Sequence, residues 1–203
     1  MQRQTGAIKD TPSKKPKVKI YIDGPNFYHG LKGMGKKYRE FQFNFSKLGL
    51  ILRTKNRELI GINYYSSPLK QQRNPEVYQQ QQRFFARLRS NCITVILCKT
   101  KYRLINPNIF IQQSKGTIKG DDIAIAVDML SDAYENVYDD GILVSSDGDF
   151  VPLVKKLQEM GKKVEILYFE NSKSWELINS CKFTRVVSKS LIRKCFIPRD
   201  EIY

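Results

Sequence analysis

Short apolar runs alternate along this chain with longer segments whose apolar residues recur every three or four positions. The short runs are typical of buried β-strands and lie at residues 18–24, 58–68, 92–98, 141–146 and 162–169. The longer segments predict helices and lie at residues 75–90, 121–137 and 149–160, with shorter helices after Pro25 and at 173–180. This alternation predicts an α/β fold. We expect a mainly parallel, twisted sheet of about five strands with helices on both faces, an α/β/α sandwich.

The segment 121–137 carries the clearest helical pattern in the chain. Its apolar residues recur at positions i, i+4, i+7 and i+11, namely Ile123, Val127, Leu130 and Tyr134. Such spacing places side chains on one face of a helix. We therefore expect these four side chains to face the core.

Charge is distributed unevenly along the chain. There are 35 Lys and Arg against 20 Asp and Glu, which gives a net charge of +15 at pH 7. Residues 121–149 nevertheless contain no Lys or Arg and carry nine acidic residues, Asp121, Asp122, Asp128, Asp132, Glu135, Asp139, Asp140, Asp147 and Asp149. An excess of positive charge is typical of proteins that bind nucleic acid, and clustered carboxylates are typical of sites for hard cations. A merely solvated Lys-rich surface, or attraction to anionic lipid, is the alternative explanation.

Composition sets the expected boundaries and compartment. Residues 1–17 are polar and rich in Lys and Pro, which indicates a disordered basic arm. One domain is expected at residues 18–184, followed by a basic C-terminal tail at 185–203. No apolar stretch resembles a secretory signal or could cross a bilayer, and the four cysteines show no CxxC spacing. We therefore expect a cytoplasmic protein with reduced thiols, no membrane contact and no structural zinc.

Four aspartates are expected to meet at one edge of the sheet. Asp23 ends the first predicted strand, and Asp147 and Asp149 follow the fourth. Parallel α/β sheets bind ligands outside the carboxyl ends of their strands. Asp122 stands at the start of the helix that follows the third strand, and that helix begins at the same edge. The convergence requires the first and fourth strands to be neighbours.

Such a cluster predicts a divalent metal. Carboxylates that are close together repel one another unless a cation is present, and Mg²⁺ or Mn²⁺ would suit oxygen ligands. A metal-bound water can then attack a phosphodiester bond. We expect Asp23 and Asp147 to be direct ligands and Asp122 to be a ligand or a base that orients the water. Asp149 would complete a second position or act through water.

Structural roles compete with these assignments. Asp122, or Asp121 beside it, can serve merely as the N-cap of the helix, and Asp147 can serve merely as part of an Asp-Gly turn. Asn26 can contact a ligating carboxylate or the scissile phosphate, or only cap its own backbone. Asp128 lies about 9 Å further along the helix than Asp122, which indicates a supporting or structural role.

Other residues are expected to assist. The residues expected to support the metal ligands without binding the metal themselves are Asn26, Asp128, Ser145 and Ser146. Residues 99–118 are basic and are predicted to form a hairpin flap beside the aspartates. The expected contacts to nucleic acid are Lys99, Lys101, Arg103 and Lys119. Tyr64, Tyr65, Tyr102 and Phe110 can stack on bases, although aromatic residues in strands are more often part of the core.

Three motifs resemble those of a known family. They are IDGPNFYHGL, KGDDIAIAVDML and LVSSDGDFVPLVKKLQEMGKKVEIL, spread over residues 18–184. Together they are similar to the NYN domain, in its LabA-like (DUF88) branch of the PIN-like nuclease superfamily. The family positions fall on Asp23, Gly24, Asn26, Lys119, Gly120, Asp122, Asp128, Ser145, Asp147, Asp149 and Phe150. Two departures are Asp121, where the family usually has an apolar residue, and the last helix, where Cys181 and Lys182 replace an Ala-Asp pair.

The resemblance implies a Mg²⁺- or Mn²⁺-dependent nuclease in which the aspartates form the metal site. Its expected partner is nucleic acid, with single-stranded RNA favoured over DNA. A non-catalytic nucleic-acid-binding or regulatory protein with the same fold is the alternative, and a phosphomonoesterase or small-nucleotide hydrolase is a third hypothesis. A homodimer is left open.

Overall fold

The computed structural model describes residues 14–35, 38–69, 71–72, 74–98, 100–102 and 116–197. Six of the described strands form one sheet in which every neighbouring pair is parallel. In sheet order they are β3 (Thr94–Leu97), β2 (Glu58–Ser66), β1 (Lys17–Asp23), β6 (Asp140–Val144), β7 (Lys163–Tyr168) and β8 (Phe183–Val186). The predicted α/β fold is confirmed, with six strands in place of about five.

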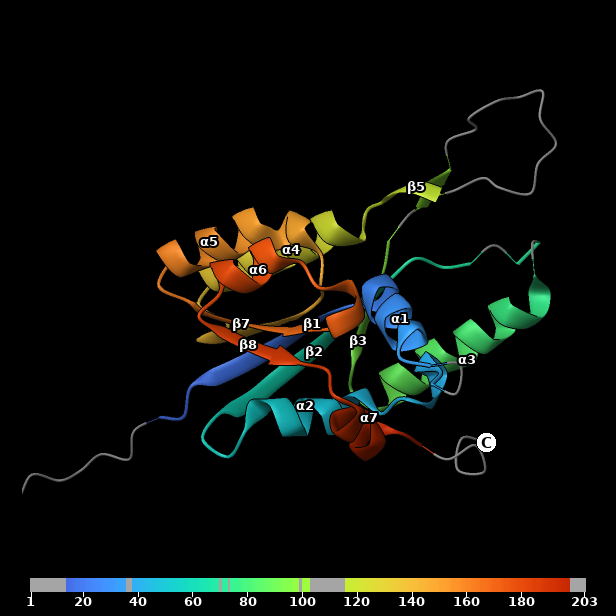
Figure 1. Cartoon of the computed structure of the whole chain (residues 1–203), viewed down its shortest axis with the longest axis horizontal. Coiled ribbons are helices and arrows are strands. Elements are labelled where there is room, and N and C mark those ends of the chain that lie inside the picture. Colours follow the sequence, from blue (N-terminus) through green and yellow to red (C-terminus); the bar gives the residue numbers. More distant parts are fainter. Residues whose placement is uncertain are drawn as a thin grey trace, which may run out of the picture.

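Helices cover both faces of this sheet (Figure 1). One face is packed by α1 (Gly24–Gly33), α2 (Phe45–Arg53), α3 (Pro75–Ser90) and α7 (Lys189–Cys195). The other is packed by α4 (Asp121–Tyr134), α5 (Val151–Glu159) and α6 (Trp175–Ser180). Strand alternation sets this division, because Ile20 and Ile22 of β1 enter the first core and Tyr21 enters the second. None of the described helices is long and apolar enough to span a membrane.

The order of the strands reverses between β1 and β6. From β1 the chain moves outward to β2 and β3, then crosses to β6 on the other side of β1 and moves outward to β7 and β8. Ile22 pairs with Val144, so Asp23 and residues 145–149 leave the sheet at the same edge. Open α/β sheets bind ligands at such a switch point. The expected contact between these two strands is confirmed.

A separate antiparallel pair precedes α4. It consists of β4 (Thr100–Tyr102) and β5 (Gly116–Lys119) and agrees with the hairpin expected there. Two of the expected nucleic-acid contacts, Lys99 and Arg103, lie outside the described residues. Lys101 and Lys119 are described by their backbone alone.

Two helices lie where the sequence analysis gives none. Helix α2 buries Leu48 and Leu52 against the sheet. Helix α7 lies within the segment 185–203 that was expected to be a tail, and it buries Ile192 and Cys195 in the same core. The described part of that segment therefore packs on the domain.

The face of α4 that packs on the sheet is not the expected one. Ile123, Val127 and Tyr134 are 67%, 55% and 81% exposed, and Leu130 is only partly buried. The buried apolar side chains are Ile125, Met129 and Ala133. Both sets of apolar residues recur with helical spacing, so the spacing alone does not show which set is buried.

Hydrogen bonds to the sheet fix the rotation of α4. The phenol of Tyr65 donates to Asp128 Oδ2 at 2.7 Å, and the phenol of Tyr21 donates to Asp132 Oδ2 at 2.5 Å. Lys19 Nζ lies 2.6 Å from the same oxygen of Asp132. These carboxylates are therefore turned toward the sheet, and the stripe that contains Ile123 and Val127 is turned to solvent.

A pair of substitutions tests this rotation. Ile125→Ala should reduce the free energy of unfolding by about 2–5 kcal/mol, because it deletes buried methyl groups and leaves a cavity. Ile123→Ala should change it by no more than about 0.5 kcal/mol, as expected at an exposed position. Urea denaturation measures both values. Equal losses would contradict the observed helix face.

Candidate functional site

Asp23 lies at the centre of the switch point. Its side chain is 3% exposed and caps α1, because Oδ1 accepts a hydrogen bond from the Asn26 amide at 3.0 Å. The turn that follows is tight. A Cβ on Gly24 would lie 2.5 Å from the carbonyl oxygen of Tyr65, so only glycine fits there. The Asp-Gly sequence therefore brings a carboxylate to the strand end and packs α1 closely on β2.

Hydrogen bonds join this turn to the turn after β6. The hydroxyl of Ser145 donates to Asp23 Oδ2 at 3.0 Å, and the amide of Ser146 donates to Asn26 Oδ1 at 3.0 Å. The Ser146 hydroxyl accepts from the Phe169 amide at 3.0 Å. Asn26, Ser145 and Ser146, which the sequence predicts to support the site, are thus placed against Asp23 or its turn.

Asp147 and Asp149 form the second side of the site. Asp147 accepts a hydrogen bond from the Asp149 amide at 3.0 Å and so caps a short 3₁₀ turn (Gly148–Phe150). Its own amide donates to the Ser145 hydroxyl at 3.1 Å. Asp147 is partly buried and Asp149 is exposed. Asp147 therefore has the turn-forming role that was considered for it. Both aspartates follow β6 and lie at the edge of the sheet where its strands end.

Helix α4 brings two carboxylates to the site from a third segment. Asp121 is 1% exposed, and its Oδ1 accepts a hydrogen bond from the Ser67 hydroxyl at 2.9 Å. Its Oδ2 has no hydrogen-bond partner among the described residues. Asp122 is only partly buried. Asp121, which departs from the family pattern, is thus the more buried of the two aspartates.

The pKa of Asp23 depends on its burial, on its hydrogen bonds and on the charges at the start of α4. The pKa of Asp23 is raised from 3.8 to about 6, chiefly because burial disfavours its charged form. Hydrogen bonds from Asn26 and Ser145 lower this pKa, while the charges of Asp122 and Asp121 raise it. Burial is therefore the main reason why the pKa of Asp23 is raised, and the charges of Asp122 and Asp121 add to this effect.

Glu40 is a partly buried acid near Asp23 that no sequence motif marks. This residue begins a short 3₁₀ helix (Glu40–Gln42), and its Oε1 accepts a hydrogen bond from the Tyr64 phenol at 2.5 Å. Burial raises its pKa to about 8, the Tyr64 hydrogen bond lowers it, and the charge of Asp23 raises it. No local motif marks Glu40, because its role depends on a contact with a distant strand.

Three further residues that the sequence singles out have defined surroundings. Asp128, for which a supporting or structural role is expected, accepts a hydrogen bond from the Tyr65 phenol at 2.7 Å, and that phenol accepts from Asn63 Nδ2 at 3.1 Å. Tyr64 and Tyr65 are 1% and 0% exposed, so neither offers a surface on which a base can stack. Phe110, with a similar expected role, lies outside the described residues.

The donor chemistry suits Mg²⁺ or Mn²⁺, although the described side chains are not gathered around one point. No three Asp, Glu, His or Cys residues within the described ranges are placed so that they could hold a metal ion. The oxygens of Asp23, Asp121 and Asp122 are nevertheless the ligand type that these ions prefer. A cation would offset the repulsion that acts on Asp23 and give the lone Oδ2 of Asp121 a partner.

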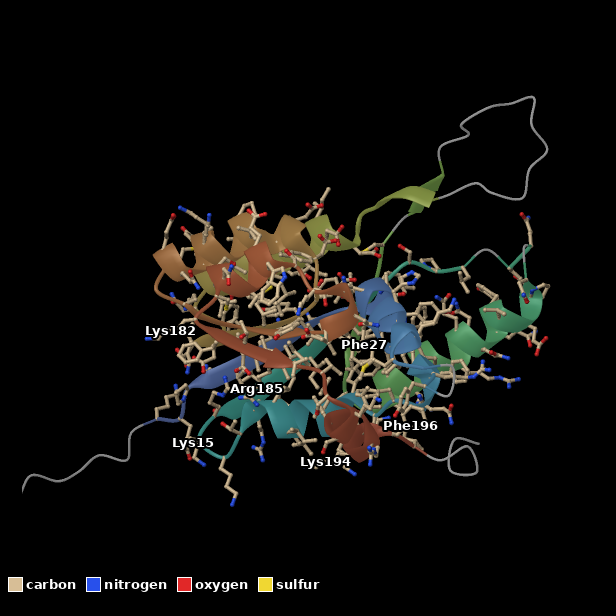
Figure 2. All side chains as sticks on the ribbon, in the orientation of Figure 1. Lys15, Phe27, Lys182, Arg185, Lys194 and Phe196 are labelled. Atoms are coloured by element: carbon tan, nitrogen blue, oxygen red, sulfur yellow. The ribbon has the colours of Figure 1, made fainter. Side chains whose placement is uncertain are left out.

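A group of basic side chains lies at the opposite edge of the sheet, where the strands begin. They line a hollow of about 1020 Å³ and include Lys14, Lys15, Lys163, Lys182 and Arg185. Figure 2 shows Lys15, Lys182 and Arg185 at this end of the molecule. This surface differs from the expected nucleic-acid contacts, which lie in the segment before α4.

Comparison with known proteins places the chain in a family. The model of the NYN domain matches residues 17–189. A crystal structure of a protein of unknown function from Vibrio parahaemolyticus shares the fold, with a TM-score of 0.66 and 22% sequence identity over 92% of this chain and 99% of that one. No curated protein matches the chain. The match over most of its length shows that the chain belongs to the NYN domain family, whose members are usually nucleases of the PIN-like superfamily.

Proposed function

We propose that this protein is a metal-dependent nuclease that hydrolyses phosphodiester bonds, preferentially in single-stranded RNA. The observation that carries the proposal is the buried carboxylate of Asp23 at the switch point. The charges of Asp122 and Asp121, which come from another segment, are close enough to raise its pKa. Such an arrangement lowers stability, and costs of this kind are typical of functional sites. NYN domains generally act on nucleic acid and typically use divalent metals.

The proposed ligands are Asp23, Asp122, Asp147 and Asp149. Asp23 is held in place by Asn26 and Ser145, so it would be the fixed ligand. The partly buried Asp147 and the exposed Asp149 would turn toward it when Mg²⁺ or Mn²⁺ binds. The bound ion supplies charge neutralisation and a more acidic water. Asp122, which is partly buried at the start of α4, would accept the proton of the attacking water or complete the ligand set.

A second function is favoured by the basic hollow at the opposite edge. Lys182 and Arg185 line it and lie at the end of the molecule away from the carboxylates. Binding of a polyanion there would not require the aspartates. A non-catalytic nucleic-acid-binding protein would keep this surface and would bind without cutting.

Cleavage of matched single-stranded RNA and DNA separates the two functions. Purified protein should cut RNA faster than DNA with Mn²⁺ and should cut neither in EDTA. Asp147→Asn should reduce the rate by about 100-fold or more, the scale of losing one group that stabilises transition-state charge, while RNA binding persists. Glu159→Gln removes an exposed carboxylate of α5 and serves as the control with unchanged rate. Tight binding with no cutting under any condition would establish the second function instead.

A further inference from the structure

A cavity of about 900 Å³ opens beside the carboxylate site. Its walls come from α1, the Glu40–Gln42 turn, the segment after β2 and α3. These elements lie together at one end of the molecule in Figure 1. The volume falls within the range of about 300–1,000 Å³ that is common for small-ligand pockets.

The cavity is lined by apolar side chains that remain exposed. Tyr28, Leu69 and Val77 come from three different segments and are 44%, 43% and 42% exposed. Phe41 and Phe84 add two further aromatic rings. Apolar groups that gather from separate elements around one hollow indicate a binding site more strongly than scattered exposed residues do.

Positive charge accompanies the rings. Lys32 Nζ lies 5.9 Å from the centre of the Tyr28 ring, and Arg39 Cζ lies 5.9 Å from the centre of the Phe41 ring. Both cations also line the cavity. Aromatic faces with adjacent Lys or Arg bind a planar base by stacking and its phosphate by charge.

The same walls reach the carboxylate site. Gly24 lines the cavity and directly follows Asp23. Ser67 also lines it, and its hydroxyl donates to Asp121. A strand whose phosphate lies at Asp23 would therefore place a neighbouring nucleotide at the mouth of this cavity.

The wall of the cavity is held in shape before any ligand binds. Gln81 Oε1 accepts a hydrogen bond from the Leu69 amide at 2.8 Å, and Gln81 Nε2 donates to the Ser67 carbonyl at 3.3 Å. Phe84, one turn further along α3, is buried. A wall fixed in this way loses little conformational entropy when a ligand binds.

We propose that this cavity receives one unstacked base next to the phosphodiester bond at the carboxylate site. The inference rests on the proposed nuclease function and makes it specific, because a single strand can deliver such a base without the cost of breaking a base pair. Tyr28 provides the stacking surface, and Lys32 and Arg39 contact the adjoining phosphates. A base held in a paired duplex cannot enter, so duplexes should be poor ligands and poor substrates.

Binding in EDTA tests the cavity without requiring catalysis. The probe is a fluorescent single-stranded RNA, compared with its duplex and with copies that lack one base at successive positions. Removing the accommodated base should weaken binding about 5- to 150-fold, the loss typical of one base–aromatic stack. Tyr28→Ala should cause a similar loss on the intact strand and little further loss on the abasic one. Tyr134→Ala, which removes an exposed tyrosine of α4, should bind like the native protein.

Cleavage with Mn²⁺ separates this inference from the proposed function. The abasic strand should no longer be cut at the bond beside the missing base, and Tyr28→Ala should no longer cut the same bond in the intact strand. These two results together would support both the cavity assignment and the nuclease function. Base-dependent binding without any cutting would support the cavity and contradict the nuclease. Equal binding and cutting of intact, abasic and duplex RNA, with Tyr28→Ala indistinguishable from Tyr134→Ala, would overturn the cavity assignment.

Discussion

An Asp23→Asn variant should lose RNA cleavage by at least about 100-fold and yet be more stable than the native protein at neutral pH. The stability gain follows from the pKa of Asp23, which the folded state raises from 3.8 to about 6. Holding this buried carboxylate ionised costs about 3 kcal/mol at neutral pH. Asn keeps the acceptor for the Asn26 amide but loses about 1 kcal/mol in the contact with Ser145, so the net gain should be about 1–2 kcal/mol.

The pH dependence has a defined sign. Below about pH 4 both the folded and the unfolded chain hold the proton of Asp23, and its contribution is zero. As the pH rises from about 4 to about 6, the unfolded chain releases this proton before the folded one, so stability falls. Above that range the full cost persists. The variant should therefore lose this part of the pH dependence.

Urea denaturation between about pH 4 and about pH 8 measures the effect. Asp132→Asn is the matched control, because Asp132 is also an aspartate facing the sheet but is bound by Lys19 and Tyr21. It should lower the free energy of unfolding by about 1–3 kcal/mol. If Asp23→Asn lowers the free energy of unfolding as much as this control does, the ionised carboxylate of Asp23 does not carry the expected cost of burial.

Arg57→Ala should be among the most destabilising single substitutions in the domain, with a loss of about 3–5 kcal/mol. Arg57 is 8% exposed and contacts two buried carboxylates, Asp140 of β6 and Glu165 of β7. Its Nη1 lies 3.1 Å from Asp140 Oδ2, and its Nη2 lies 3.2 Å from Glu165 Oε2. It also donates to the carbonyl of Leu52 at 2.5 Å. Removing the guanidinium leaves two carboxylates buried with less compensation.

A neighbouring cation provides the comparison for Arg57. Lys163 Nζ lies 3.8 Å from Asp140 Oδ2, but its side chain is 46% exposed. Lys163→Ala should therefore cost no more than about 1 kcal/mol. Chemical denaturation of both variants at pH 7 measures the difference. Similar losses for the two would mean that burial does not set the strength of this ion pair.

The sequence was sufficient for the features that depend on local pattern. Strands that alternate with helices predict a parallel sheet, and Asp-Gly at the end of a strand predicts a tight turn with a carboxylate at the carboxyl edge. The pairing of β1 with β6 then brings Asp23 to the turn that contains Asp147. The hydrogen bonds of Asn26 and Ser145 follow from the same short turns.

The remaining features depend on contacts between distant segments. The buried stripe of α4 begins with Asp121, a charged residue that pattern analysis discounts, while the stripe with Ile123 has equally good spacing. Tyr65 and Tyr21 of the sheet determine which stripe is buried, because their phenols donate hydrogen bonds to Asp128 and Asp132. Glu40 is likewise defined only by its contact with the Tyr64 phenol. One sequence does not reveal such pairs.

The most direct test of the nuclease site is a time course of end-labelled single-stranded RNA with the native protein and with Asp23→Asn, each in Mn²⁺ and in EDTA. Loss of activity in this variant cannot be attributed to unfolding if denaturation shows that it is at least as stable as the native protein. The proposal predicts cutting by the native protein in Mn²⁺ alone and a rate at least about 100-fold lower for the variant. Equal cutting by both proteins, or cutting that persists in EDTA, would contradict it.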